Sequence, residues 1–227
     1  MAGFFPLFFK QYWSAGFSAV ESTYMLGLVN SIASFALALS APALGAIADQ
    51  GGWRKPFLFL FPVLGIAGSL ALGFIGKAER FWAMSWFALG MVGLPGAQTF
   101  YDALLVQVAE RKHFDRVSGL GYALGYLGGG VLFAFNVWMF LKPETFGIAG
   151  KPEAVKISFI TVAIWWFLFS LPVFFQVPER AARMSGAWRG IILEGFRGLA
   201  RHGRALSGQK PLFFFLLGFL FYNDAVN

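Results

Sequence analysis

The sequence contains no cysteine, only two histidines and few charged residues, which make up 13% of the chain. Without cysteine there is neither a disulfide framework nor a zinc–thiolate site. The histidines, His113 and His202, lack the spacing of a metal-binding motif such as H-E-x-x-H, and no phosphate-binding loop of the G-x-x-x-x-G-K-[ST] type occurs. The sequence therefore predicts no metal and no cofactor, and it argues against an enzyme.

Apolar residues are abundant instead. They make up 58% of the chain and include 29 Phe and 8 Trp, far from the composition of a soluble domain. The sequence therefore predicts an integral membrane protein whose first partner is the lipid bilayer. In such a protein the net charge of +7 reports which loops lie on which side of the membrane, so we expect no nucleic-acid partner.

Five stretches are long enough to span a bilayer, which takes about 20 mostly apolar residues. They are residues 24–48, 57–76, 81–108, 117–141 and 157–178. Two further apolar segments are shorter. Residues 2–9 end at Lys10 and a Tyr12-Trp13 pair typical of a membrane interface, and residues 211–227 stop within an apolar run. We expect both to be incomplete helices, so the chain resembles a fragment at both ends.

Most of the 18 Lys and Arg residues fall in connections on one side of the predicted membrane. By the positive-inside rule, loops 49–56, 109–116 and 179–210 are then cytoplasmic. The last of these is a basic stretch with apolar residues three and four apart, which predicts an amphipathic helix on the lipid surface. It divides the chain into a helical bundle (1–178), a linker (179–210) and a further helix (211–227). A regulatory or partner-binding role for the linker is the alternative.

One polar turn interrupts the apolar pattern, in the stretch LGAIADQGGWRKP. It resembles the G-x-x-x-D-R-x-G-R-K signature after the second helix of the major facilitator superfamily. Gln50 and Trp53 depart from that signature. The residues that carry the resemblance are Gly45, Asp49, Gly52, Arg54 and Lys55. Together with DRVSGLGYALGYLGGG and FYNDAVN, the stretch is similar to the branch that contains the vacuolar amino-acid effluxers, or autophagy-related effluxers, and many bacterial permeases.

This resemblance implies an all-α polytopic fold: the N-terminal six-helix half of a twelve-helix transporter, with its first helix incomplete, plus part of helix seven. It implies a secondary active transporter in the bacterial inner membrane that moves a small polar solute by alternating access. The solute would be an amino acid by family analogy, with a proton or cation as a coupling partner. The alternative is a polytopic receptor or scaffold without transport activity. We expect residues 1–227 alone to show no saturable flux.

The polar turn itself allows two interpretations. A carboxylate at Asp49 beside the Arg54 guanidinium can exchange partners when two helical halves move, and so act as a gate. Alternatively, the turn only ends a helix and keeps positive charge inside.

A second motif is a row of glycines four residues apart, Gly121, Gly125 and Gly129, which favours close helix packing. The row also resembles the fifth-helix glycine pattern of superfamily antiporters, with Tyr126 in place of its proline.

Ionisable residues inside a bilayer are costly and indicate function. Asp224, flanked by Asn223 and Asn227, is predicted in the last helix near the middle of the bilayer, where it would bind substrate or a coupling ion; the alternative is a structural acceptor. Asp102, after Tyr101, is predicted near the inner boundary.

Two roles for Asp102 stay open. It is either a partner for Arg111 or Arg116, or a coupling group in its own helix, which Pro95 bends.

Overall fold

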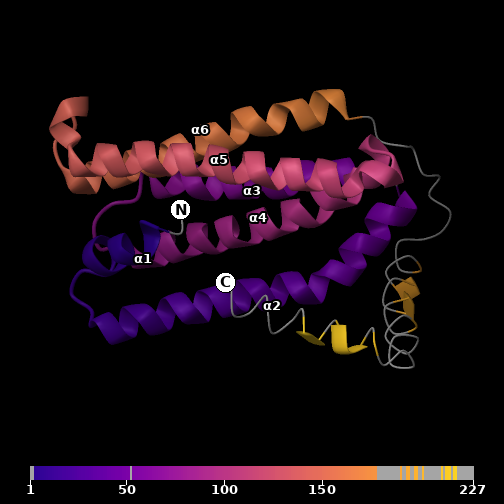
Figure 1. The fold of residues 1–227 in the computed structure, drawn as a ribbon. Helices are drawn as coiled ribbons and strands as arrows, with labels where there is room; N and C mark the ends of the chain where they lie inside the picture. The colour runs from indigo at the N-terminus through magenta and orange to yellow at the C-terminus, as the bar shows by residue number, and fades with distance from the viewer. Residues whose placement is uncertain are drawn as a thin grey trace. The chain divides into compact units, whose positions relative to one another are not determined.

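A computed structural model of the protein describes residues 3–51 and 53–177, together with scattered residues between 190 and 218. In this part of the chain every regular element is helical (Figure 1). The elements are α1 Phe5–Phe8, a π-helical turn η1 Phe9–Trp13, α2 Ala19–Gly51, α3 Arg54–Leu72, α4 Arg80–Val108, a 3-10 turn η2 Arg111–His113, α5 Phe114–Leu141, a 3-10 turn η3 Pro143–Phe146 and α6 Lys151–Gln176.

Four described segments are long and apolar enough to cross a membrane: Ala19–Ala41, Arg54–Leu72, Arg111–Leu141 and Lys151–Gln176. This confirms the expectation of an all-α polytopic membrane protein. The finer prediction, the six-helix half of a major facilitator fold, stays a prediction.

Helix α4 is long enough to span a membrane, yet it is not among these four segments. Its second half carries Pro95, Gln98, Tyr101 and Asp102, which lower its average apolarity. The predicted span over residues 81–108 is therefore a helix, but a less apolar one than its neighbours.

The chain divides into two compact units, residues 1–38 with 54–180 and residues 39–53 with 181–227. The first unit contains α1, η1, the start of α2 and all of α3 to α6. The predicted domain boundaries at residues 178 and 210 stay predictions.

Within the first unit, α3 packs most extensively against α4 and next against α6, and α5 packs mainly against α6 (Figure 1). The beginning of α3 lies beside the end of α6, where the Lys55 ammonium donates a hydrogen bond to the Phe174 carbonyl oxygen at 3.2 Å. The end of α4, the beginning of α5 and the end of α6 meet around one cavity. These helix ends are the ones that adjoin loops 49–56, 109–116 and 179–210, which the sequence predicts on one side of the membrane. That this side is cytoplasmic remains a prediction.

Helices α3 and α4 approach each other so closely that glycine is required where they cross. A Cβ atom added at Gly93 would lie 2.6 Å from the Gly65 Cα, and one added at Gly68 would lie 2.6 Å from the Trp86 carbonyl oxygen. Both are backbone contacts, which cannot be relieved by rotating a side chain. Small residues are the usual means by which membrane helices reach such proximity.

An aromatic cluster fills the end of the first unit that lies away from the cavity. The Phe5 and Phe87 rings stack with their centroids 3.8 Å apart, and Trp13 is fully buried between Phe5 and Phe159. The Trp13 indole N–H points at the Ile75 carbonyl oxygen, 3.5 Å away. Trp13, predicted as an interfacial residue, is thus a core residue, because its ring packs inside this aromatic cluster.

The long helices begin earlier than their apolar runs suggest, most clearly α2 and α6. At α2 the Glu21 carboxylate accepts bonds from the Ser18 backbone N–H (2.9 Å) and hydroxyl (2.8 Å), while the Glu21 N–H donates to the Ser18 hydroxyl oxygen (3.2 Å). This capping box starts the helix before the first predicted apolar residue. Helix α6 likewise begins at Lys151, with Pro152 in its first turn, where proline is well tolerated.

Replacing Ser69 with Ala should lower stability modestly. The fully buried Ser69 hydroxyl donates to the Phe159 carbonyl oxygen at 2.9 Å and so joins α3 to α6. Interhelical bonds of this kind contribute about 0.6 kcal/mol on average, so we expect a drop in thermal midpoint of a few degrees at most. Unfolding in detergent measures it. Ser85→Ala is the control, because within the described residues the Ser85 hydroxyl donates to Phe81 of its own helix and joins no second helix; an equal loss there would contradict the prediction.

Candidate functional site

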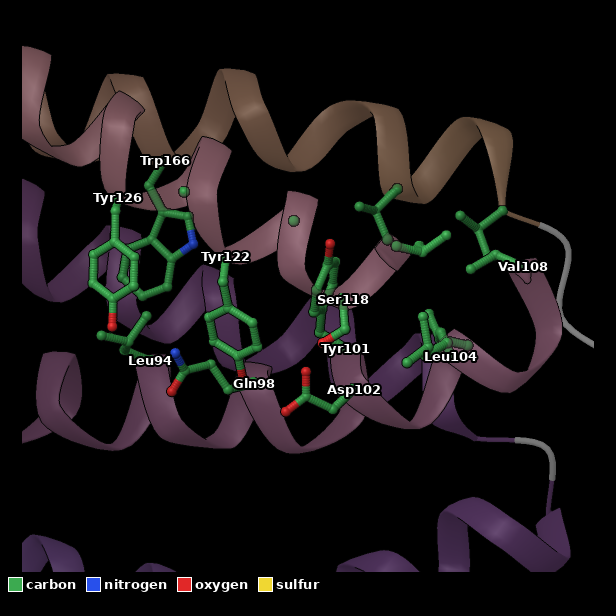
Figure 2. Close-up of a pocket in the computed structure, with 16 residues that line it drawn as sticks. Leu94, Gln98, Tyr101, Asp102, Leu104, Val108, Ser118, Tyr122, Tyr126 and Trp166 are labelled. Carbon is green, nitrogen blue, oxygen red and sulfur yellow. The ribbon is translucent and has the colours of Figure 1, made fainter. Parts of the chain in front are cut away.

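A cavity of about 690 Å³ lies between α4, α5 and α6 of the first unit (Figure 2). This volume is in the range of small-molecule binding sites. Its walls are mostly apolar, with six polar side chains among the described lining residues: Gln98, Tyr101 and Asp102 from α4, and Ser118, Tyr122 and Tyr126 from α5.

Helical periodicity brings these side chains together. On α4 the residues Leu94, Gln98 and Asp102 follow one another at intervals of four, so they share one face of the helix. On α5 Ser118, Tyr122 and Tyr126 do the same. Figure 2 shows Tyr122 and Tyr126 extending from α5 toward α4. Two polar stripes on otherwise apolar helices therefore face a common space.

Glycines leave room for that space. Gly121 and Gly125 line the cavity, and a Cβ atom at Gly121 would lie 3.6 Å from the Tyr101 hydroxyl oxygen. A Cβ atom at Gly125 or Gly129 would meet no described atom within 4 Å. The packing role predicted for Gly121, Gly125 and Gly129 thus stays a prediction, while glycines of α3 and α4 make close contacts between those two helices.

Trp166 of α6 contributes the aromatic wall of the cavity. Its indole ring occupies the space that a Cβ atom at Gly65 would need. Gly65 is also the residue that Gly93 approaches. The crossing of α3 and α4 therefore determines where this wall of the cavity stands.

Asp102 supplies the charge of the cavity. It is the only charged residue among the described residues that line it. Within the described parts of the chain, Asp102 forms no ion pair with Arg111 or Arg116; the ion pair in that loop joins Lys112 and Glu110 at 2.7 Å. The two roles predicted for Asp102 both stay predictions.

The polar turn contributes a helix-to-helix link. Lys55 donates to the Phe174 carbonyl oxygen near the end of α6, where a positive charge is favoured by the helix dipole. Gly45 lies within α2 and Arg54 begins α3. The Asp49 side chain and Gly52 lie outside the described residues, so a gating role for this turn stays a prediction.

Asn223, Asp224 and Asn227 also lie outside the described residues, and their predicted coupling role is unchanged. In the described ranges, no group of three or more His, Asp or Glu side chains is placed to hold a metal ion. The structure therefore adds Gln98, Ser118, Tyr122, Tyr126 and Trp166 to the predicted pair Tyr101 and Asp102.

The family described as "Vacuole effluxer Atg22 like" matches residues 11–113 and 106–227 of the chain. The chain is 34% identical over 225 residues to the uncharacterized MFS-type transporter YxiO of Bacillus subtilis, covering 98% of this chain and 52% of that protein. It is 32% identical over 149 residues to an uncharacterized protein of Aquifex aeolicus, covering 65% of this chain and 36% of that protein.

A more distant similarity links the chain to autophagy-related protein 22 of Eremothecium gossypii, at 23% identity over 116 residues, 48% of this chain and 22% of that protein. No solved structure matches the chain. The chain spans about half the length of the Bacillus relative, and less of the other two.

Proposed function

This chain belongs to the Atg22-like vacuole effluxer family, and on that premise we propose that it forms the solute-binding N-terminal half of a secondary active transporter of the major facilitator type. The relatives are named as transporters or autophagy proteins and not as enzymes. The solute is small and polar, and an amino acid is among the compounds whose ammonium group Asp102 would attract.

One observation carries the proposal: the polar faces of α4 and α5 meet at one cavity in a bundle of apolar helices. Polar and ionisable side chains inside a membrane are retained where they serve a solute or ion pathway. In transporters of this type such sites lie between two helical repeats that rock about the bound solute. The Bacillus relative is about twice as long as this chain, which leaves room for a second bundle.

The remaining parts of the proposal follow from the topology. Residues 211–227 would begin the second half, where Asp224 would serve the coupling role that the sequence predicts. Residues 179–210 would connect the halves along the cytoplasmic surface of the bacterial inner membrane, which the abundance of Lys and Arg in this connection supports.

Replacing Gln98 with Leu should raise the KM of saturable flux by about tenfold, because the variant keeps the apolar wall but loses hydrogen bonds to the solute. Flux is measured in membrane vesicles containing the complete polypeptide that the gene encodes, with a panel of amines and amino acids. The matched control is Thr99→Val on the next position of α4, since the Thr99 hydroxyl bonds to Pro95 of its own helix and lies outside the cavity.

The outcome separates the two interpretations. Saturable flux that is sensitive to Gln98→Leu and insensitive to Thr99→Val supports the transporter. The absence of flux for every compound would support a scaffold without transport activity.

A further inference from the structure

The described lining of the cavity carries negative charge and no positive charge. Asp102 is a carboxylate on the α4 face of the cavity, and no Lys, Arg or His is found among the described lining residues. Its polar neighbours, Gln98, Ser118 and three tyrosines, are neutral groups that can donate or accept hydrogen bonds. A solute that enters therefore meets one fixed negative charge.

Aromatic rings supply the second element of recognition. Tyr101, Tyr122 and Tyr126 come from the helices on either side of the cavity, and Trp166 forms a further wall (Figure 2). The face of an aromatic ring attracts a cation placed within about 6 Å of it, and the attraction is larger where water is excluded. Rings also bind apolar surface. A carboxylate and four aromatic side chains that line the same cavity form a combination that recognises an organic ammonium ion.

A carboxylate on the solute would be disfavoured in the same place. Carboxylates are bound most strongly by Arg or Lys, or by the free N–H groups at a helix N-terminus. The described cavity wall offers no basic side chain, and the solute carboxylate would share the space with Asp102. A zwitterion thus gains one favourable contact and acquires one repulsive one.

On these grounds we propose that the cavity selects organic cations, namely a primary or quaternary ammonium group attached to an aromatic or apolar body, over zwitterionic amino acids. This inference rests on the proposed function and narrows its substrate class. The cavity volume of about 690 Å³ accommodates such a molecule with its ammonium group at Asp102 and its apolar body against Tyr122, Tyr126 and Trp166.

Three compounds that differ by single groups test the proposal. The probes are 2-phenylethylammonium, phenylalanine, which adds a carboxylate, and 2-phenylethanol, which replaces the ammonium group with a neutral hydroxyl. The complete polypeptide that the gene encodes is purified in lipid nanodiscs, and its binding of each probe is measured by calorimetry. We expect the cation to bind at least about tenfold more tightly than either of the other two, the size of effect that a charge-assisted contact supplies.

Variants identify the groups responsible. Asp102→Asn should weaken binding of the cation by about tenfold or more and leave binding of 2-phenylethanol within about twofold. Tyr122→Leu should weaken cation binding by about threefold to thirtyfold, whereas Tyr122→Phe, which keeps the ring, should not. The unfolding midpoint of each variant, measured in the same nanodiscs, shows that the bundle is intact.

Two results would overturn the proposal. If phenylalanine binds as tightly as the cation, the cavity accepts zwitterions, with the carboxylate held at the N-terminal turn of α5, and the transporter assignment still stands. If none of the probes binds, the selectivity for organic cations is wrong. Flux that responds to Gln98→Leu would then decide separately whether the chain serves transport.

Discussion

Replacing Asp102 with Asn is expected to reduce solute flux by at least about a hundredfold while leaving the protein folded. The amide has nearly the same shape as the carboxylate, and within the described residues Asp102 makes no ion pair whose loss would destabilise the bundle. What disappears is the negative charge of the cavity, and with it the attraction for a cationic group or a coupling proton. The measurement is initial-rate flux in vesicles containing the complete polypeptide.

Glu110→Gln is the matched control. Glu110 follows shortly after the end of α4, is well exposed and pairs with Lys112 outside the cavity, so its neutralisation should leave flux within about twofold, as expected for an exposed pair. Unchanged flux in Asp102→Asn would contradict a coupling role for this residue. Asp224→Asn in the same assay then tests the other predicted carboxylate, and a full loss of flux there alone would assign coupling to the last helix.

Replacing Gly93 with Val is expected to destabilise the bundle by more than about 3 kcal/mol, enough to abolish most folded protein. The new Cβ would lie 2.6 Å from the Gly65 Cα and 2.8 Å from the Phe61 carbonyl oxygen, so α4 must move away from α3. Because the Trp166 ring rests on Gly65, that movement would also displace the aromatic wall of the cavity. The yield of monodisperse protein in detergent and its thermal midpoint measure the loss.

Gly129→Val on α5 provides the comparison. It makes the same chemical change in another apolar helix, where a Cβ atom meets no described atom within 4 Å, and it should cost little. Equal destabilisation by the two variants would mean that the glycine row of α5 packs against residues outside the described part of the chain, as the sequence pattern predicts. Tolerance of Gly93→Val would contradict the close crossing of α3 and α4.

The helices were predictable because lipid imposes a length and an apolarity that are visible in the sequence. The ends of the helices were less predictable, because local hydrogen bonds hold polar first turns that an apolar run does not include. Ser18 and Glu21, for example, form a capping box before the apolar run of α2. Glycine spacing could not tell the two glycine faces apart. Glycines also recur along α3 and α4, and only the neighbouring surface shows that these mark a close helix crossing, while the packing role of the α5 row stays a prediction.

The cavity was partly predictable. Asp102 and Tyr101 stand out as polar residues in an apolar helix, and the four-residue interval from Gln98 to Asp102 would have added a third. Trp166 could not be foreseen, because it reaches the cavity from α6 through the packing of that helix on Gly65. Such a contact depends on tertiary structure and leaves no periodic signal in the sequence.

The reduced apolarity of α4 also has a consequence for biogenesis. A translocon releases a segment into lipid according to its apolar character, and Gln98, Tyr101 and Asp102 weaken that partition for α4. Helix α3, which is synthesised just before it, offers both strong partition and the glycine surface that α4 fits. We therefore expect α3 to help retain its less apolar partner α4 in the membrane during synthesis.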